Sequence, residues 1–522
     1  MPGYPLPPEP NLKEGVPPLG QDLGRRTFEG SLWILADRLY RQLLFLGSAV
    51  VLGRLLSPKD FGLVGLGALA VQFLGVLTYT GYGEALVQRP HLTEGEIHTA
   101  WWVTLGRAAA IGVILWAAAP FIAGLAHEPA ATPILRALAA VQLLSGLTSV
   151  GPALLYKEMQ FRQLFKLEAW GATINLLVAV VVALWWRSVW ALVLGVVAGT
   201  GVRVVVSYVL YPYQPRWVFD WRAARELFRF GQWLLLTACL YFFATKGIDV
   251  LSGFIFGAVA LGLYQMASRF ALLPTNHLGE MFLQAMFPAY SLMQDDPQRL
   301  RRSFLKVLQV TTFMIFPLSA VIAVALGPAL PLFLGPKWQG VVSLVPALAV
   351  GGAVQALLRT GPPLFLATGR PSLQFAMDAA SCLGILLFIY PLSRVFGLAG
   401  LAWSYALGLS LGLPLWCRFV CRQTQARVPD LAATIAPALA GSLMLAAVIW
   451  LPNQKLYWSP LTWTAFGRLL FFAGLGALAY LLFIMLLERV LSAYQPVRDS
   501  VNLVQKWWSG RERTPEFTTP QP

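Results

Sequence analysis

The sequence predicts an all-α polytopic membrane protein, and its composition, its apolar runs and the placement of its Lys and Arg residues each support this fold class. Of the 522 residues, 57% are hydrophobic and only 12% are charged. This charged share is about half of that in an average soluble domain. Because so few charged side chains cannot cover so much apolar surface in water, we expect a membrane to cover it.

Apolar runs of about 20 residues, the length that crosses a ~30 Å hydrocarbon core, recur along the chain with short polar breaks. The eighth run is interrupted by Pro274 and His277, which favours either a long kinked helix or a helix with a re-entrant piece. In total the sequence predicts 14 spans, at residues 31–53, 61–80, 99–125, 132–156, 167–186, 189–210, 230–251, 255–287, 304–330, 341–366, 372–392, 397–420, 431–451 and 465–487.

Lys and Arg residues remain on the cytoplasmic side of short loops, so their distribution tests this set of spans. With the N-terminus inside, 24 of the 39 Lys and Arg residues fall in cytoplasmic loops and tails, and 6 fall in external loops. One miscounted span would exchange the sides of every later loop. The distribution therefore favours 14 spans with both termini in the cytoplasm.

The tails and loops exclude several classes of protein. Residues 1–28 are rich in Pro and Gly and lack the order of a cleaved signal peptide, so we expect a flexible cytoplasmic tail. No predicted loop exceeds about 20 residues and no GxxxxGK[ST] stretch is present, which excludes transport driven by a nucleotide-binding domain of the chain itself. The 4 Cys residues have no paired loop spacing, so we expect no disulfide framework and no metal site. The net charge of +15 is explained by membrane topology rather than by nucleic acid as a partner.

Weak internal similarity links the two halves of the chain. The segment that begins at Gly30 is matched about two hundred residues later by a segment that begins at Gly231. The common order of these matches suggests two related halves around a central site, as in many transporters. The matched pairs are Gly30 and Gly231, Leu35 and Leu236, Leu39 and Leu240, Tyr40 and Tyr241, Gly53 and Gly253, Gly62 and Gly262, and Leu63 and Leu263.

The first span carries Asp37, Arg38 and Arg41 where a lipid-facing helix would carry Leu. Each such charge at mid-bilayer costs about 3 kcal/mol, so the three are tolerated only where they face a water-filled cavity or a partner. Asp37 and Arg41 are four residues apart and can pair on a helix. One carboxylate then leaves one arginine unpaired, and we expect Arg38 or Arg41 to contact an anionic ligand.

Basic residues outnumber acidic residues among the other charges of the spans, which suits phosphate or carboxylate groups in a cleft between the halves. Two simpler interpretations stay open: Lys246 and Asp249 can neutralise each other as a pair three residues apart, and Arg359 can extend to the membrane interface. Aromatic rings suit stacking on sugars. The predicted substrate-binding residues are Arg38, Arg41, Lys246, Arg269, Arg359, Tyr40 and Tyr241.

Acidic side chains within the spans are candidates for coupling transport to protons or sodium ions, because a carboxylate in a membrane cavity can carry a cation. A structural salt bridge is the alternative for each of them. We expect no other cofactor. The candidates are Asp37, Asp249, Glu280 and Asp378.

Six stretches carry a family resemblance: GRLLSPKDFGLVGL, TYTGYGEALVQR, ALLYKEMQFRQLFKLE, GAVALGLYQMASRF, FPAYSLMQDDPQRLRRSF and LATGRPSL. They resemble the oligosaccharide flippases, which are Wzx-like polysaccharide-biosynthesis transporters of the multidrug/oligosaccharidyl-lipid/polysaccharide superfamily. The similarity covers roughly residues 28–425. It implies a transporter rather than an enzyme, with two pseudo-symmetric six-helix lobes around a central cationic cavity.

The cargo that the resemblance implies is an undecaprenyl-pyrophosphate-linked oligosaccharide, moved by alternating access from the cytoplasmic to the outer leaflet of a bacterial plasma (inner) membrane. The implied partners are this lipid-linked glycan, membrane lipids, a glycan polymerase and glycosyltransferases. The expected segments are a cytoplasmic tail at 1–28, an N-lobe at 29–211, a cytoplasmic linker at 212–229, a C-lobe at 230–425, spans 13 and 14 at 426–490, and a cytoplasmic tail at 491–522 that is either interfacial helix or disordered.

Three alternatives stay open. A cation-coupled multidrug or metabolite antiporter of the same superfamily would favour a net acidic cavity, against the basic surplus seen here. A flippase for the peptidoglycan precursor also has 14 spans and central arginines. A non-transport protein, such as a membrane scaffold or a glycan polymerase, is the third alternative, and a polymerase would carry a large external loop with acid and base residues.

Overall fold

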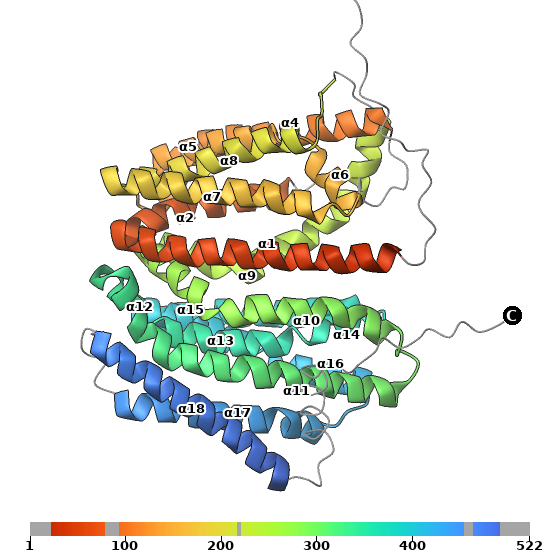
Figure 1. The fold of residues 1–522 in the computed structure, drawn as a ribbon, viewed down its shortest axis with the longest axis vertical. Coiled ribbons are helices and arrows are strands. Elements are labelled where there is room, and N and C mark those ends of the chain that lie inside the picture. Colours follow the sequence, from red (N-terminus) through yellow and green to blue (C-terminus); the bar gives the residue numbers. More distant parts are fainter. Residues whose placement is uncertain (1–21, 79–92, 217–220, 454–462, 491–522) are drawn as a thin grey trace, which may run out of the picture. The chain divides into compact units, whose positions relative to one another are not determined.

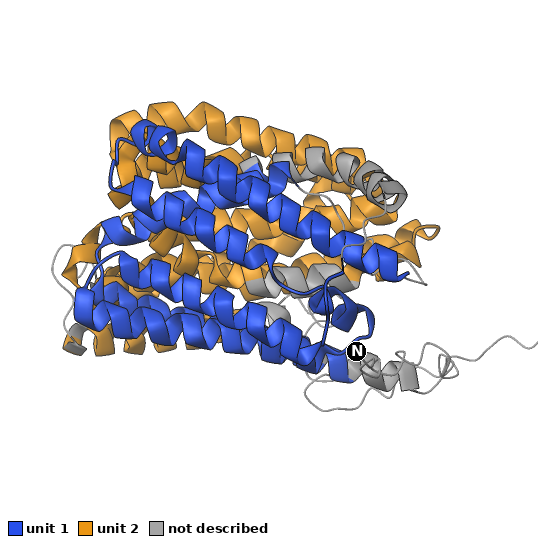
Figure 2. Ribbon diagram, turned by 90° about the horizontal axis from the view of Figure 1, so that it is seen from above, with its two compact units in different colours: residues 1–242 blue, residues 243–522 orange. Residues whose placement is uncertain are grey.

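The computed structural model describes residues 22–78, 93–216, 221–453 and 463–490. Within these ranges every regular element is a helix, as the apolar runs predict. The chain forms two compact units, residues 1–242 and residues 243–522 (Figure 2). In the described ranges nine helices are long and apolar enough to cross a membrane, or ten if a bent pair counts as one span.

The described residues of unit 1 contain seven complete helices that pack side by side (Figure 1). Each of the first six predicted spans coincides with a helix or a pair of helices, and the fourth is the bent pair α5 and α6, at an angle of 55°. The helices are α1 (Asp22–Leu55), α2 (Pro58–Leu77), α4 (Glu94–Leu125), α5 (Ala131–Gly146), α6 (Gly151–Lys157), α7 (Phe161–Trp186) and α8 (Trp190–Leu210).

Capping residues explain where two of these helices begin. Ser57 and Asp60 form a reciprocal capping box at the start of α2, and Thr93 and Glu96 form another at the start of α4. Such caps satisfy the backbone N–H groups that the first turn of a helix leaves without partners.

Ion pairs identify the two ends of unit 1. At one end Lys59 Nζ lies 2.8 Å from Glu128 Oε2. At the other end the segment that follows α8 is fixed to the start of α4, because Arg216 Nη1 lies 3.2 Å from Glu94 Oε2 and Trp102 Nε1 donates to the carbonyl of Arg216. The pairs join loops that the topology prediction places on the same side of the membrane.

The long helix α9 (Trp221–Ala271) folds back on itself at Gly257, where φ is 78° and ψ is −177°. Only glycine adopts this backbone region readily. Asp249 and Gln265, on opposite sides of the turn, interact, although a continuous helix would hold them about 24 Å apart. The two arms follow the predicted spans 7 and 8.

The predicted eighth span consists of two helices. The second arm of α9 ends at Ala271, and α10 (Leu273–Ser291) begins after a break at Leu272, with Pro274 in its first turn. Proline suits a first turn because its missing N–H would have no partner there. The predicted span is thus interrupted at Leu272, two residues before the predicted Pro274.

A second fold-back occurs in α15 (Pro371–Ser410) at Gly397, where φ is 58°. Gly384 and Gly408 lie against each other across it, since a Cβ atom on Gly384 would stand only 3.0 Å from the Cα atom of Gly408. The first arm coincides with predicted span 11, and the second arm together with the next helix, Leu413–Thr424, covers predicted span 12. The other helices of unit 2 are α11 (Pro297–Val321), α12 (Gly327–Leu334), α13 (Val345–Leu358), α14 (Gly361–Ala367), α16 (Leu413–Thr424), α17 (Val428–Asn453) and α18 (Trp463–Val490).

The last two helices pack on α11. Leu445 and Ile449 of α17 meet Leu469 of α18 and Ala325 in one buried cluster. At the other end of α17, Arg301 Nη2 of α11 donates to Asp430 Oδ2 over 2.5 Å, and the backbone N–H of Arg427 donates to the same oxygen over 2.7 Å. Spans 13 and 14, which carry no family motif, are thus an integral part of unit 2.

We expect Asp430→Ala to lower the free energy of unfolding by about 1–2 kcal/mol, because it removes both a helix cap and an ion pair. A lower apparent unfolding temperature of the purified chain in detergent would show this effect. Asp295→Ala is the matched control, because Asp295 is exposed and has no partner among the described residues. Equal unfolding temperatures for the two variants would contradict the prediction.

Candidate functional site

Helix α1 carries Asp37, Arg38 and Arg41 within its apolar part, as the sequence predicts. Arg41 forms an ion pair with Asp37 through one carboxylate oxygen, Oδ2. The other oxygen, Oδ1, is buried and has no hydrogen-bond partner in the described part of the chain. Arg38 is half-buried, and no described residue forms an ion pair or hydrogen bond with it. Among the described residues, Arg41 thus has a counter-ion on its own helix and Arg38 has none.

Contacts with α7 fix the orientation of α1. The rings of Trp33 and Tyr40 both pack against Phe165, with centroids 5.5 and 5.7 Å apart. The Tyr40 hydroxyl forms a hydrogen bond of 2.7 Å with the hydroxyl of Thr173. One helix face thus meets α7, and it includes Tyr40 and Asp37, which lie seven and four residues from Trp33.

Two further charged residues, which are not among the predicted site residues, complete this cluster. Glu168 of α7 accepts from Arg203 of α8, with Nη2 2.5 Å from Oε1, and its second oxygen lies 3.9 Å from Arg41 Nη1. Arg203 lies within a predicted span, so its charge could have marked it as a candidate site residue. Glu168 lies at the edge of its predicted span, where a charged residue is common and indicates no function.

The cluster has a surplus of positive charge. It contains two carboxylates and three guanidinium groups. The acids are the more buried members, with Asp37 and Glu168 side chains 16% and 25% exposed, whereas Arg41 and Arg203 are 47% and 48% exposed. The more buried acids therefore pair with the more exposed arginines, whose remaining N–H groups are accessible. We call these five residues the α1 cluster: Asp37, Arg38, Arg41, Glu168 and Arg203.

A second charged cluster lies in unit 2, around the fold-back of α9. Lys246 Nζ stands 3.8 Å from Asp249 Oδ2, so the pair that the helical spacing predicts does form. Asp249 is buried, and Arg269 from the second arm interacts with it, as does buried Tyr264. Two cations face one carboxylate among the described side chains, which again gives a positive surplus. We call Lys246, Asp249, Tyr264 and Arg269 the α9 cluster.

The structure also brings together two other predicted residues of unit 2. Arg359, at the end of α13, interacts with Asp378 of α15, and Gln374 lies one helical turn before that acid and interacts with it. This group is neutral. The side chains of Tyr241 and Glu280 lie outside the described ones.

The α1 and α9 clusters share a surplus of guanidinium and ammonium groups, which are the groups that bind anions in proteins. A family model described as polysaccharide biosynthesis protein matches residues 51–343, which is more than half of the chain.

The chain belongs to this family.

Curated relatives of this polysaccharide biosynthesis protein cover most of its length at low identity. It is 24% identical over 358 residues to the lipopolysaccharide biosynthesis protein WzxC of Escherichia coli, a match that covers 68% of the chain and 73% of WzxC. It is 23% identical to the teichuronic acid biosynthesis protein TuaB of Bacillus subtilis, over 73% of the chain and 80% of TuaB. The succinoglycan biosynthesis transport protein ExoT of Rhizobium meliloti is 26% identical over 62% of the chain and 66% of ExoT.

Solved structures share its fold. The lipid II flippase MurJ, in an inward closed conformation, matches with a TM-score of 0.70 at 13% identity, over 88% of this chain and 99% of MurJ. A multidrug resistance MATE family transporter in its inward-facing conformation matches with a TM-score of 0.57 at 15% identity, over 74% of this chain and 95% of that transporter. The chain therefore has the same fold as these two solved transporters.

Proposed function

We propose that this membrane protein is a transporter, not an enzyme, and that it flips a lipid-linked oligosaccharide for cell-surface polysaccharide biosynthesis. Membership of the polysaccharide biosynthesis protein family supports this function, as do the relatives named for polysaccharide biosynthesis and transport. The observation that carries the chemistry is Arg38 of the basic α1 cluster, which has no counter-ion among the described residues, because a guanidinium group within apolar helices requires water or an anion.

The cargo that fits is a glycan joined to a prenyl chain by a diphosphate. Guanidinium groups bind phosphate oxygens through paired, charge-assisted hydrogen bonds. The sugars require a wet cavity, whereas the prenyl chain can stay in lipid. We propose that Arg38, Arg41, Lys246 and Arg269 bind the diphosphate and that Tyr40 and Tyr241 contribute to sugar binding. Arg359 is the remaining substrate-binding candidate.

We propose 14 transmembrane helices in two pseudo-symmetric lobes, residues 29–211 and 230–425, around a central cavity, with residues 426–490 added as two helices. Alternating access between the two sides of the membrane then moves the cargo. Asp37, Asp249, Glu280 and Asp378 are the candidates for proton or sodium coupling. Glycosyltransferases that make the cargo and a polymerase that consumes it are the proposed protein partners.

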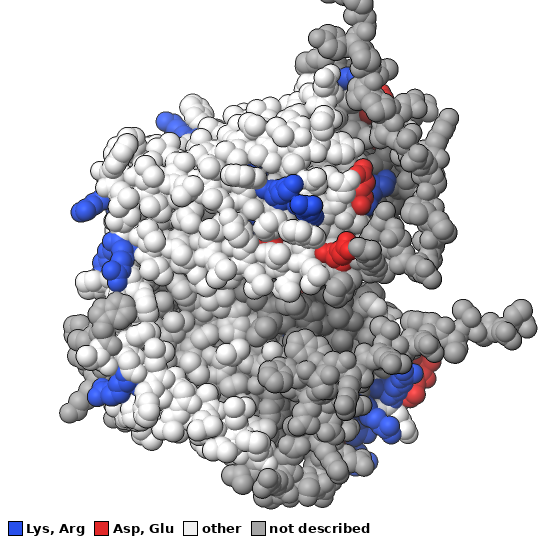
Figure 3. Space-filling view, in the orientation of Figure 1, with Lys and Arg blue, Asp and Glu red and all other residues white. Residues whose placement is uncertain are grey.

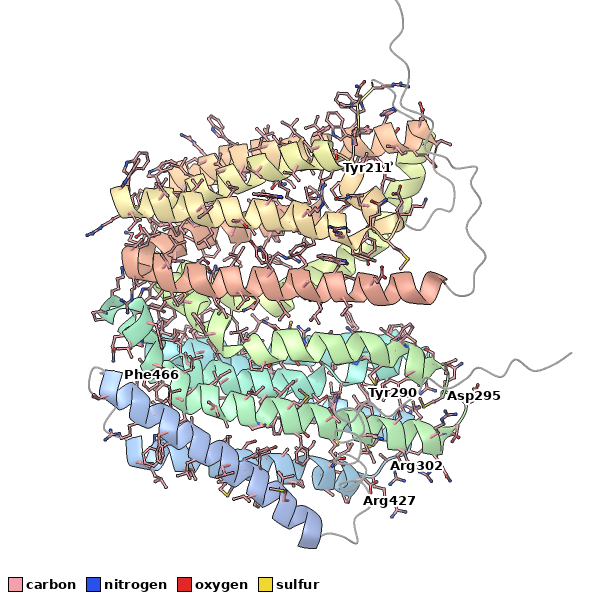
Figure 4. All side chains as sticks on the ribbon, in the orientation of Figure 1. Tyr211, Tyr290, Asp295, Arg302, Arg427 and Phe466 are labelled. Atoms are coloured by element: carbon pink, nitrogen blue, oxygen red, sulfur yellow. The ribbon has the colours of Figure 1, made fainter. Side chains whose placement is uncertain are left out.

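We further propose that both termini and the 212–229 linker are cytoplasmic, in the plasma membrane of a bacterium. Asp295, Arg302 and Arg427 lie at one end of unit 2 (Figure 4). The basic side chains at the starts of α11 and α17 and along α16 are exposed, which supports a cytoplasmic position for this end under the positive-inside rule. These residues are Arg299, Arg302, Lys306, Arg418, Arg422 and Arg427.

Expression in cells that lack their own oligosaccharide flippase tests the proposed function. We expect the chain to restore export of a surface polysaccharide in at least one strain of a panel with different glycans. A strain that lacks its peptidoglycan-precursor flippase forms the second arm, and rescue of that strain alone would replace the proposed cargo by the peptidoglycan precursor. Efflux of organic cations without glycan export would instead identify an antiporter, against the positive surplus of both clusters.

A further inference from the structure

Glu168 joins arginines from two different helices. Its Oε1 atom lies 2.5 Å from Arg203 Nη2 on α8, and its Oε2 atom lies 3.9 Å from Arg41 Nη1 on α1. A single carboxylate cannot neutralise two guanidinium groups, and Asp37 is the other acid in contact with Arg41. Arg41 and Arg203 are thus linked through Glu168, and Asp37 pairs with Arg41 from the other side.

Small residues bring Arg203 into this position. On α7, Gly171 leaves room for α8, because a Cβ atom there would lie 3.3 Å from the carbonyl oxygen of Gly199 and 3.5 Å from the Cβ atom of Arg203. The close approach of the helices directs the stem of Arg203 across α7 to Glu168. The ion pair between Glu168 and Arg203 therefore depends on the close packing of α7 and α8.

Arg203 does not belong to the lipid-facing side of α8. The exposed side chains Val205 and Val209 identify that side. On a helix they lie about 200° and 240° around the axis from Arg203. Arg203 is nevertheless 48% exposed, and Glu168 beneath it is 25% exposed. Figure 3 shows Lys and Arg side chains at the surface of unit 1 part-way along α7.

The accessible donors of Arg203 can bind an anion. A guanidinium group has five N–H donors, and a carboxylate engages one edge of it. A charged group within an apolar span is costly unless it meets water or a counter-charge, so the exposed edge needs one of these. An approaching phosphate would compete with Glu168 for the same guanidinium group.

We propose that Arg203 is a further substrate-binding residue that takes one phosphate of the diphosphate while Arg38 and Arg41 take the other, and that Glu168 is the internal counter-ion that the diphosphate displaces. This inference rests on the proposed function. Glu168 keeps Arg41 and Arg203 in place without cargo and competes with the cargo when it is bound, which weakens binding and favours release.

Binding of prenyl phosphates to the purified full-length chain in lipid nanodiscs tests this inference. The probes are geranylgeranyl diphosphate and geranylgeranyl monophosphate. We expect Arg203→Gln to weaken diphosphate binding about tenfold, which corresponds to the loss of one charge-assisted hydrogen bond, and to change monophosphate binding less than threefold. Arg203→Lys keeps the positive charge and should restore most of the diphosphate affinity.

The direction in which Glu168→Gln changes the diphosphate affinity is the decisive result. If Glu168 competes with the diphosphate, this variant binds the diphosphate several-fold more tightly; if it has only a packing role, the variant binds more weakly. Arg136→Gln is the control, because Arg136 stacks on Trp116 at 4.7 Å, outside the α1 cluster.

Two failures are distinguishable. A wild-type chain that binds the diphosphate with the same affinity as Arg203→Gln, or more tightly than Glu168→Gln, overturns the inference and leaves the proposed function intact. A wild-type chain that shows no preference for the diphosphate over the monophosphate overturns the proposed diphosphate cargo itself. Unchanged unfolding temperatures of the variants ensure that a loss of binding is not a loss of fold.

Discussion

Replacing Arg38 and Arg41 together by Gln is expected to reduce glycan export to the level of cells that carry no flippase. Two charge-assisted contacts to phosphate are lost, at a cost of about 3–6 kcal/mol, which corresponds to roughly a hundredfold or greater loss of binding. Asp37 and Glu168 remain in place, so the acids would outnumber the one remaining arginine, Arg203, and would repel an anion. Export in a flippase-deficient strain, normalised to the amount of protein in the membrane, measures the effect.

The single variants distinguish the contribution of Arg38 to export from that of Arg41. Arg38 has no partner among the described residues, so Arg38→Gln removes only ligand contact and should leave the fold intact. Arg41→Gln also breaks its ion pair with Asp37, so a lower unfolding temperature is expected in addition to lost export. Arg136→Gln should export normally. Normal export by a well-expressed double variant would remove the α1 cluster from the transport mechanism.

Substitution of Gly257 by Val is expected to prevent correct assembly of unit 2. The φ of 78° and ψ of −177° at this position lie in a region that residues with side chains rarely adopt, at a cost of about 1–3 kcal/mol and more for a β-branched residue. The turn also holds Asp249 against Arg269, so its loss would separate this buried carboxylate from one of its two cations. Size-exclusion profiles and unfolding temperatures of the detergent-solubilised chain measure the effect.

Gly247→Ala is the matched control, ten residues earlier in the same helix. A Cβ atom at Gly247 would meet no atom within 4 Å, and alanine favours the helix. We therefore expect this variant to be at least as stable as the original chain. A Gly257→Val variant that is as monodisperse and stable as Gly247→Ala would show that the fold-back does not depend on glycine.

The apolar runs predicted the helices well because membrane spans need long uninterrupted apolar segments. Their ends were less accurate: α11 begins at Pro297, where Asp296 caps it, although the predicted span begins at residue 304. The polar first turns of such helices extend beyond the apolar run that the sequence reveals. The sharp turns at Gly257 and Gly397 need no polar loop, so a pattern of hydropathy cannot place them to the residue.

The α1 cluster was predicted in part. Local spacing identified the Asp37 and Arg41 pair and the excess of arginine on α1, because both depend on one helix only. The pairing of Glu168 with Arg203 depends on how α7 packs against α8, which one sequence does not contain. The role of Tyr40 in packing on Phe165 and Thr173 likewise becomes visible only when its neighbour is known.

Translocation by the purified chain in sealed vesicles tests the central claim most directly. The vesicles carry a radiolabelled undecaprenyl-diphosphate-linked oligosaccharide in both leaflets, and periodate, which does not cross the membrane, oxidises the sugars that reach the outer leaflet. The account predicts that the chain exposes the inner-leaflet glycan to periodate much faster than vesicles with the Arg38→Gln and Arg41→Gln double variant do. Equal exposure in the two preparations, at the rate of protein-free vesicles, would contradict it.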